Sequence, residues 1–297
     1  MIISELSKSA GFYSQLFFLM NHYLTAKKNM QKFTIKSDTW LFKYNKGWED
    51  YFKNIDITEG NNSENKYGKH HMHMDAFTIT EYKEIIKEIY IYNDLTQIKI
   101  EQIKKKLNMT DYDSIFIRHG DKLSGESNYI PTEKYIKVLL EKNPQCHTIF
   151  LQTDDYNVYT ELQDYIRQNN LQINVITLCK ENTKGGMIIF NINKTGIEQA
   201  HNIHEVNKPY ISTVIDDLRK FLPIDCMTHD EIYEHTIEMI IGIDIVLNSN
   251  ICICEYSSNV SRFIKLASNN SNNVYDVNQN KDIDWNKTTC PAYELLF

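Results

Sequence analysis

Between residues 114 and 268, short apolar runs alternate with longer segments of helical periodicity, and this alternation constrains the fold most. The apolar runs predict strands at Ser114–Ile117, Thr148–Leu151, Ile173–Leu178 and Ile251–Cys254. The periodic segments predict helices at Thr132–Lys142, Val158–Asn169, His229–Leu247 and Asn259–Ser268. Strands that alternate with helices form parallel sheets with helices on both faces, so we expect an α/β fold with a doubly wound sheet.

The first third of the chain has longer helical stretches. Its patterns predict a helix at Ser14–Lys28, a strand that ends near Trp40 and one long helical region at Thr80–Leu107. At 297 residues the chain exceeds the usual domain size of roughly 100–200 residues, which favours two domains. We expect an N-terminal α/β domain at residues 1–108 and a C-terminal Rossmann-like domain at residues 109–297.

Composition excludes several classes of function. A net charge of −7 argues against bulk nucleic-acid binding, which requires basic patches. No apolar stretch is long enough to span a bilayer, and the N-terminal segment lacks the features of a signal peptide. The six cysteines include no CxxC pair, which suits reduced thiols. We therefore expect a cytoplasmic protein.

Hydrogen-bonding side chains follow three of the predicted strands directly. Arg118 follows the first strand, Asp154 and Asp155 follow the second, and Ser257 and Ser258 follow the strand that ends at residue 254. Because parallel strands end at the same edge of a sheet, these side chains are expected to line one crevice. The helix after the two serines would present its N-terminal N–H groups there, which favours a phosphate.

Other readings of single motifs have less support. The sequence RHG at 118–120 resembles the histidine phosphatase signature, but Lys122 stands where that family needs an arginine. The DYD at 111–113 precedes its strand, although a metal-binding DxD motif would follow it. The KHHMHMD stretch at 69–75 could bind a transition metal, but a polar loop is the simpler interpretation. Neither GxGxxG nor GxxxxGK[ST] occurs.

Taken in order, the motifs resemble those of the α-1,6-fucosyltransferases and related nodulation fucosyltransferases. The first block is matched by Arg118, His119, Asp121, Lys122, Glu126, Pro131 and Tyr135. The second is Thr153-Asp154-Asp155, and the third is Ser257, Ser258, Val260 and Arg262. Upstream matches are Lys8, Gly11, Gln15, Leu16, Trp40 and Gly47-Trp48-Glu49. Two positions depart from the family, where His119 replaces an arginine and Phe116 replaces a histidine that helps to hold guanine.

The resemblance implies a GT-B-like fold, in which two Rossmann-like domains face each other across a cleft. It implies inverting transfer of fucose from GDP-fucose to a glycan hydroxyl, with no metal and no other cofactor. Glu126 is then the base, and Arg118 and Lys122 stabilise the departing diphosphate. The implied nucleotide-sugar-binding residues are Lys8, Gly11, Phe12, Phe116, Arg118, His119, Asp121, Tyr135, Asp154, Asp155, Asp244, Ser257, Ser258, Asn259 and Arg262.

Two alternatives stay open at this point. The chain could use another nucleotide sugar, or it could bind a nucleotide sugar without catalysing transfer. Phe116 and His119 motivate both alternatives, because they depart from the family where it contacts the base and the phosphate. Asp154 and Asp155 could also act as helix caps instead of contacting hydroxyl groups.

Overall fold

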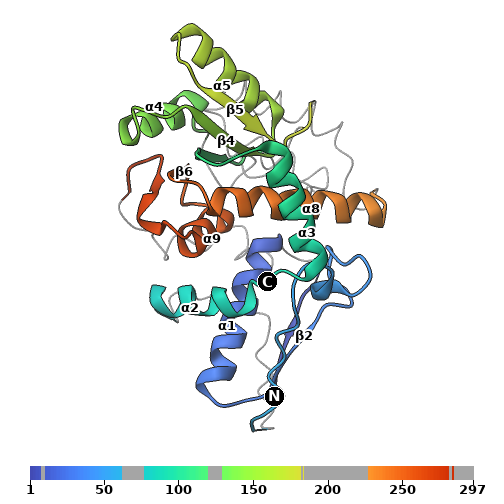
Figure 1. Cartoon of the computed structure of the whole chain (residues 1–297). Coiled ribbons are helices and arrows are strands. Elements are labelled where there is room, and N and C mark those ends of the chain that lie inside the picture. The colour runs from blue at the N-terminus through green and yellow to red at the C-terminus, as the bar shows by residue number, and fades with distance from the viewer. Residues whose placement is uncertain are drawn as a thin grey trace, which may run out of the picture.

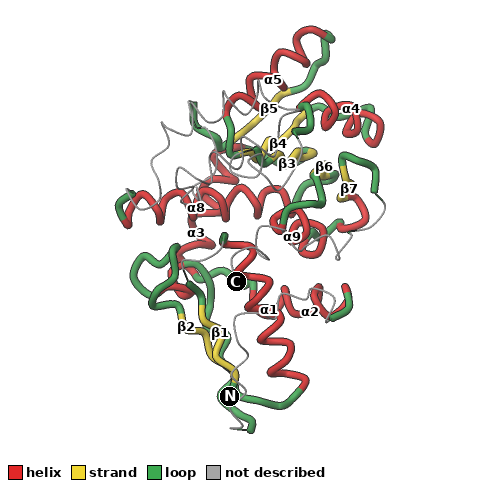
Figure 2. The backbone as a smooth tube through the Cα atoms, turned by 180° about the vertical axis from the view of Figure 1, so that it is seen from behind, coloured by secondary structure: helices red, strands yellow, loops and turns green. Residues whose placement is uncertain are grey.

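A five-stranded parallel sheet organises the C-terminal part of the protein. The computed structural model describes residues 1–7, 11–61, 77–119, 129–181, 183, 227–280 and 283. The strands are β3 (Asp113–Ile117), β4 (Thr148–Thr153), β5 (Asn174–Thr177), β6 (Cys252–Cys254) and β7 (Val274–Asp276). They lie in the order β5-β4-β3-β6-β7, and every neighbouring pair is parallel (Figure 2). The predicted α/β fold with a parallel sheet is confirmed.

Helices cover both faces of this sheet (Figure 1). On one face, Ile115 and Ile117 of β3 share a hydrophobic cluster with residues of α4 (Thr132–Lys142) and α5 (Tyr156–Gln168). On the other face, Phe116 belongs to a second cluster with residues of α8 (His229–Leu247) and α9 (Asn259–Ala267). Successive side chains of a strand point to opposite faces, so β3 contributes to both cores.

Helix α8 approaches the sheet closely at one glycine. A Cβ atom at Gly242 would clash with the side-chain amide of Gln152 on β4. Glycine leaves the space that the Gln152 side chain occupies, and a larger residue at 242 would require this flexible side chain to move.

The described residues of the N-terminal part form a two-stranded parallel sheet and three α-helices. The strands are β1 (Ile2–Glu5) and β2 (Phe33–Lys36), and helix α1 (Phe12–Lys28) connects them. A 3-10 helix, η1 (Gly47–Asp50), follows β2. Helices α2 (Ile79–Ile89) and α3 (Asp94–Leu107) then lead to β3.

The prediction of one helical region at Thr80–Leu107 is wrong, because the chain breaks between α2 and α3. Asn93 caps α3 by accepting a hydrogen bond of 2.8 Å from the N–H of Thr96. Within the break, Phe52 forms an isolated β-bridge with Tyr92. An Asn cap and a tertiary contact therefore end a pattern that is helical in the sequence.

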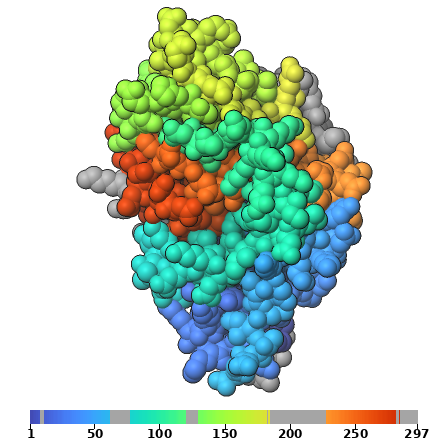
Figure 3. Space-filling model, viewed as in Figure 1, coloured from blue at the N-terminus to red at the C-terminus, as the bar shows by residue number. Residues whose placement is uncertain are grey.

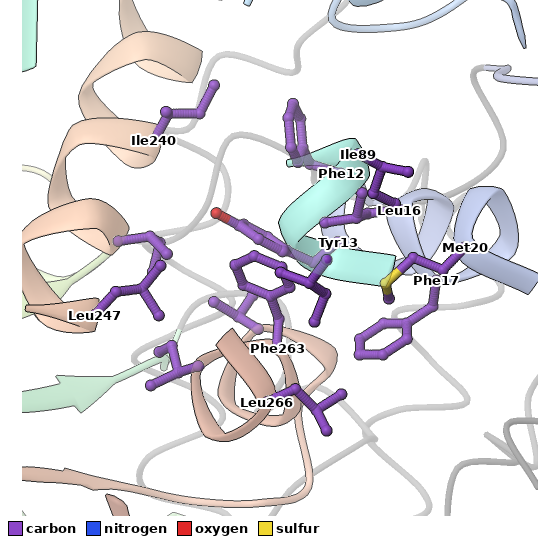
Figure 4. Packing of buried hydrophobic residues seen from close by; sticks show 14 of the residues in the cluster. Phe12, Tyr13, Leu16, Phe17, Met20, Ile89, Ile240, Leu247, Phe263 and Leu266 are labelled. Carbon is purple, nitrogen blue, oxygen red and sulfur yellow. The ribbon is translucent and has the colours of Figure 1, made fainter. Parts of the chain in front are cut away.

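Helices α1 and α2 pack against α9 through aromatic rings. The ring of Phe263 faces that of Tyr13 at a centroid distance of 5.0 Å (Figure 4). The centroid of the Tyr90 ring lies 4.6 Å from that of Phe263. One hydrophobic cluster accordingly runs from β1 and α1 to α8 and α9. In the space-filling view the two parts of the chain meet along a broad contact (Figure 3). The division into two domains near residue 108 stays a prediction.

The composition predicts the absence of a membrane-spanning segment and the presence of reduced cysteines, and the described residues bear on both. None of the helices described is both long and apolar enough to cross a membrane. The cysteines at 146, 179, 252 and 254 carry free thiols, and Cys252 and Cys254 share one hydrophobic cluster, as their alternation predicts. The cytoplasmic location stays a prediction.

The contact at Phe263 generates a stability prediction. Phe263→Ala removes a fully buried ring between α1, α2 and α9, so it should lower the free energy of unfolding by about 3–5 kcal/mol. Leu95→Ala, at an exposed site of α3, should change it by less than about 0.5 kcal/mol. Urea unfolding of both variants checks this. A cost below about 1 kcal/mol for Phe263→Ala would contradict the packing described.

Candidate functional site

The order of the strands creates a crevice between β3 and β6. From β3 the chain proceeds outward to β4 and β5, and it later returns to the opposite side of β3 to form β6 and β7. The segments that leave the carboxyl ends of β3 and β6 therefore diverge toward opposite faces of the sheet. In open α/β sheets this switch point is where ligands bind.

A small pocket lies at this switch point. It collects residues from the ends of β3 and β6 and from the starts of α4 and α9: Phe116, Arg118, Tyr135, Glu255, Ser257, Ser258 and Ser261. Five of the seven are among the residues predicted from the sequence. The first and third strand-end motifs are thus brought together in space.

Arg118 is held at the pocket by the second motif. Its Nε lies 3.8 Å from Oδ2 of Asp154, and both side chains are about four-fifths buried. Oδ1 of Asp154 accepts a hydrogen bond of 2.9 Å from the backbone N–H of His119. One carboxylate therefore braces both the guanidinium of Arg118 and the backbone that follows it.

His119 contributes a neutral ring to this region. Its side chain is only 4% exposed, and its ring lies 5.1 Å from that of Tyr129. Burial lowers the pKa of His119 to about 4, and a hydrogen bond with the backbone of Ile130 only partly opposes this effect. Near neutral pH the imidazole is uncharged, so it is no electrostatic substitute for the family arginine.

The third motif presents the N-terminus of α9 to the pocket. Ser258 is the N-cap, and its hydroxyl accepts a hydrogen bond of 3.1 Å from the N–H of Ser261. The next residue, Asn259, donates a hydrogen bond of 2.8 Å to the hydroxyl of Ser14 and accepts one of 3.1 Å from the buried Arg262. The positive end of the α9 dipole and the guanidinium of Arg118 thus lie at the same pocket, an arrangement that favours an anion.

Other predicted residues lie elsewhere. Asp155 caps α5 by accepting a hydrogen bond of 2.9 Å from the N–H of Asn157, and Gly11 is the N-cap of α1. Phe12 is buried in an aromatic cluster, where its ring lies 5.2 Å from that of Trp40. Asp244, near the end of α8, forms an ion pair with Lys104 of α3. The structure does not bring Phe12 or Asp244 to the pocket.

Several predicted residues lie outside the described part of the chain. These are Lys8, Asp121, Lys122 and Glu126, as well as the KHHMHMD stretch. The DYD sequence is described and leads into β3 at the amino edge of the sheet, where Asp113, the first residue of the strand, accepts a hydrogen bond of 2.7 Å from Asn143. In the regions that the structure describes, no group of three or more His, Cys, Asp or Glu side chains could hold a metal ion.

Two residues of the pocket are absent from the sequence-based prediction, namely Glu255 and Ser261. Glu255 directly follows β6, so its position after a predicted strand indicates, from the sequence alone, that it lies at the carboxyl edge of the sheet. Ser261 lies one turn into α9, where only the capping pattern with Ser258 indicates that it faces the pocket.

The burial of His119 predicts a specific pH dependence. The folded-state pKa of about 4 lies below the unfolded value of about 6.5, so the unfolded chain binds a proton more readily between these values. Lowering the pH from 7 to 5 should therefore reduce the free energy of unfolding by about 2 kcal/mol through this residue. Urea unfolding at both pH values should show that His119→Gln removes this part of the pH dependence. An unchanged slope would mean that His119 titrates normally in the folded protein.

Comparison with known proteins agrees with this architecture. No protein-family model matches the sequence, and no curated protein shows significant similarity to it. Among solved structures, a crystal structure of NodZ alpha-1,6-fucosyltransferase soaked with GDP-fucose is similar, with a TM-score of 0.52 and 10% identity. The match covers 89% of this chain and 91% of that one. A second NodZ structure, co-crystallised with GDP, has 9% identity, the same coverage and a TM-score of 0.49. The protein thus has the fold of the NodZ alpha-1,6-fucosyltransferase.

Proposed function

We propose that this protein is a glycosyltransferase that transfers fucose from GDP-fucose to a glycan hydroxyl. One observation carries the proposal: the residues of the first and third motifs line a single pocket at the switch point of the sheet. The NodZ structure with the same fold was soaked with GDP-fucose, and this supports the choice of donor class.

In the proposed reaction, the pocket binds the diphosphate of the donor. We infer that Arg118 and the N-terminus of α9, which both lie at the pocket, hold the β-phosphate, which gains negative charge as its bond to the sugar breaks. Charge-assisted hydrogen bonds of this kind contribute roughly 1.5–3 kcal/mol each. The fixed positive groups act without proton transfer, since an arginine keeps its charge at neutral pH.

Inversion follows from attack on the face of the sugar opposite the diphosphate. The acceptor oxygen forms the new bond to the anomeric carbon while the bond from that carbon to the β-phosphate oxygen breaks. The electron pair leaves with GDP, and the acceptor proton passes to a base. Glu126 is the residue we propose as this base, and it lies outside the described part of the chain. We further propose that the reaction needs no metal ion.

Phe116 is the observation that favours an alternative donor. Its ring lines the pocket, at the position where the fucosyltransferase family places a histidine that helps to hold guanine. An aromatic ring stacks on any base and does not read hydrogen-bonding edges. A transferase for another nucleotide sugar, or a protein that only binds one, is therefore the alternative.

A panel of nucleotides distinguishes these donors. GDP and GDP-fucose should raise the melting temperature more than UDP-sugars or dTDP-sugars do, because phosphate and sugar contacts persist in the pocket. At about a hundredfold excess over Kd, the expected stabilisation is about 2.7 kcal/mol. Arg118→Ala should lose most of it without unfolding the free protein. A larger shift with UDP-sugars or dTDP-sugars would reject the guanine assignment, and no shift with any nucleotide would reject the proposal itself.

Asp154 and Asp155 provide a matched test of the phosphate site. If Asp154 acts by bracing Arg118, Asp154→Ala should weaken GDP binding about tenfold but cost nothing further in an Arg118→Ala background. Asp155→Ala should leave GDP binding unchanged and lower stability by about 1 kcal/mol, because Asp155 caps α5.

Calorimetric titration with GDP measures the affinity of the wild type, the Arg118→Ala and Asp154→Ala variants and the double variant. Urea unfolding measures the stability that Asp155→Ala loses. Additive losses in the Arg118 and Asp154 variants would show that Asp154 contacts the ligand directly. Equal losses of GDP affinity in Asp154→Ala and Asp155→Ala would contradict the assignment of different roles to the two aspartates.

A further inference from the structure

Glu255 places a carboxylate in the pocket that is proposed to bind a diphosphate. It follows the last residue of β6, whose cysteines at 252 and 254 point to the α8 side of the sheet. Alternation along the chain directs Glu255 to the opposite side, where Tyr135 of α4 also lines the pocket. Both side chains line the pocket, where burial raises the pKa of Tyr135 and the Glu255 carboxylate raises it further.

Glu255 and Arg118 leave neighbouring strands and line the same pocket. In the ladder between β3 and β6, Ile115 pairs with Ile253. The same register continued by two residues puts Glu255 beside Ile117, the residue before Arg118. A negative side chain at this point opposes phosphate binding, since like charges repel each other in a partly buried site. Asp154 already braces Arg118 from the side of β4, so a second carboxylate at this pocket calls for a role toward another part of the donor.

We propose that Glu255 is a specificity residue that accepts hydrogen bonds from hydroxyl groups of the transferred sugar. This inference depends on the proposed function, because it assumes a nucleotide sugar in the pocket. The sugar of such a donor is bonded to the β-phosphate, whereas the ribose is bonded to the α-phosphate. A side chain that shares a pocket with Arg118 consequently faces the sugar end of the donor. Carboxylates accept hydrogen bonds from hydroxyl groups and have no proton to donate at neutral pH.

The signature of this role is an opposite effect on two ligands. GDP lacks the sugar, so the proposed role gives it no hydrogen bond to Glu255, and the carboxylate repels its phosphates. Glu255→Gln should therefore bind GDP as tightly as the wild type or up to severalfold more tightly. GDP-fucose loses the charged acceptor for its hydroxyls. The preference for GDP-fucose over GDP, given by the ratio of the two Kd values, should therefore fall about tenfold.

Calorimetric titration without an acceptor measures both ligands on each variant. Glu255→Ala should lower the preference at least as far as Glu255→Gln. Glu133→Gln removes the same charge from the solvent side of α4, where Glu133 pairs with Lys137, and it should leave both Kd values unchanged. The preference is a ratio within one preparation, so a fraction of unfolded protein does not alter it. Thermal unfolding of each variant accompanies the titrations.

Each other outcome rejects the assignment in a distinct way. Weaker binding of GDP by Glu255→Gln would mean that the carboxylate orients Arg118 or contacts the ribose, and not the transferred sugar. If Glu255→Gln bound GDP and GDP-fucose more tightly by the same factor, charge repulsion would be the whole effect of Glu255 on binding. If the wild type binds neither GDP nor GDP-fucose, the proposed function fails and this inference fails with it. If the wild type binds both and the preference is unchanged in Glu255→Gln, only the inference fails.

Discussion

The central position of β3 is the constraint on which the site depends. It pairs with β4 on one side and with β6 on the other, so the three strand-end motifs can meet only around its carboxyl end. The ladder with β4 aligns Ile117 with Thr153, and the next residues, Arg118 and Asp154, emerge side by side. A shift of one residue in this ladder would turn Arg118 toward the other face of the sheet. Hydrogen bonds of the backbone thereby position the charge of the pocket.

Local signals in the sequence predicted much of this architecture. Helices α4 and α8 begin and end at the predicted residues, and α8 starts with a capping box formed by Thr228 and Glu231. Strands β1 and β7 were not predicted, because runs of three or four residues become strands only through partners that are distant in the sequence. The break between α2 and α3 was missed for a related reason, since its contact with Phe52 is tertiary.

The site was predicted as a set of strand ends, but the roles within it were not separable from sequence. Asp154 and Asp155 are neighbours with the same side chain, yet one braces Arg118 and the other caps α5. Phe12 is aromatic like Phe116, but it lies in the core of the N-terminal part. An aspartate carboxylate can either cap a helix or bind a ligand, and a phenylalanine ring can either pack in the core or stack on a base. Only the three-dimensional arrangement distinguishes these roles. Glu255 was missed because it belongs to none of the matched motifs.

The aromatic packing around Phe263 has a consequence for how such a protein can evolve. Tyr13 and Tyr90 come from the first third of the chain, whereas Phe263 belongs to the helix that opens at the pocket. A fragment that contains only the large sheet would expose this ring and the apolar side of α9 to water. Gene fusion or exchange at the middle of the chain would therefore have to preserve a complementary aromatic surface. The shared hydrophobic cluster thus couples the sheet and its pocket to the N-terminal part of the chain.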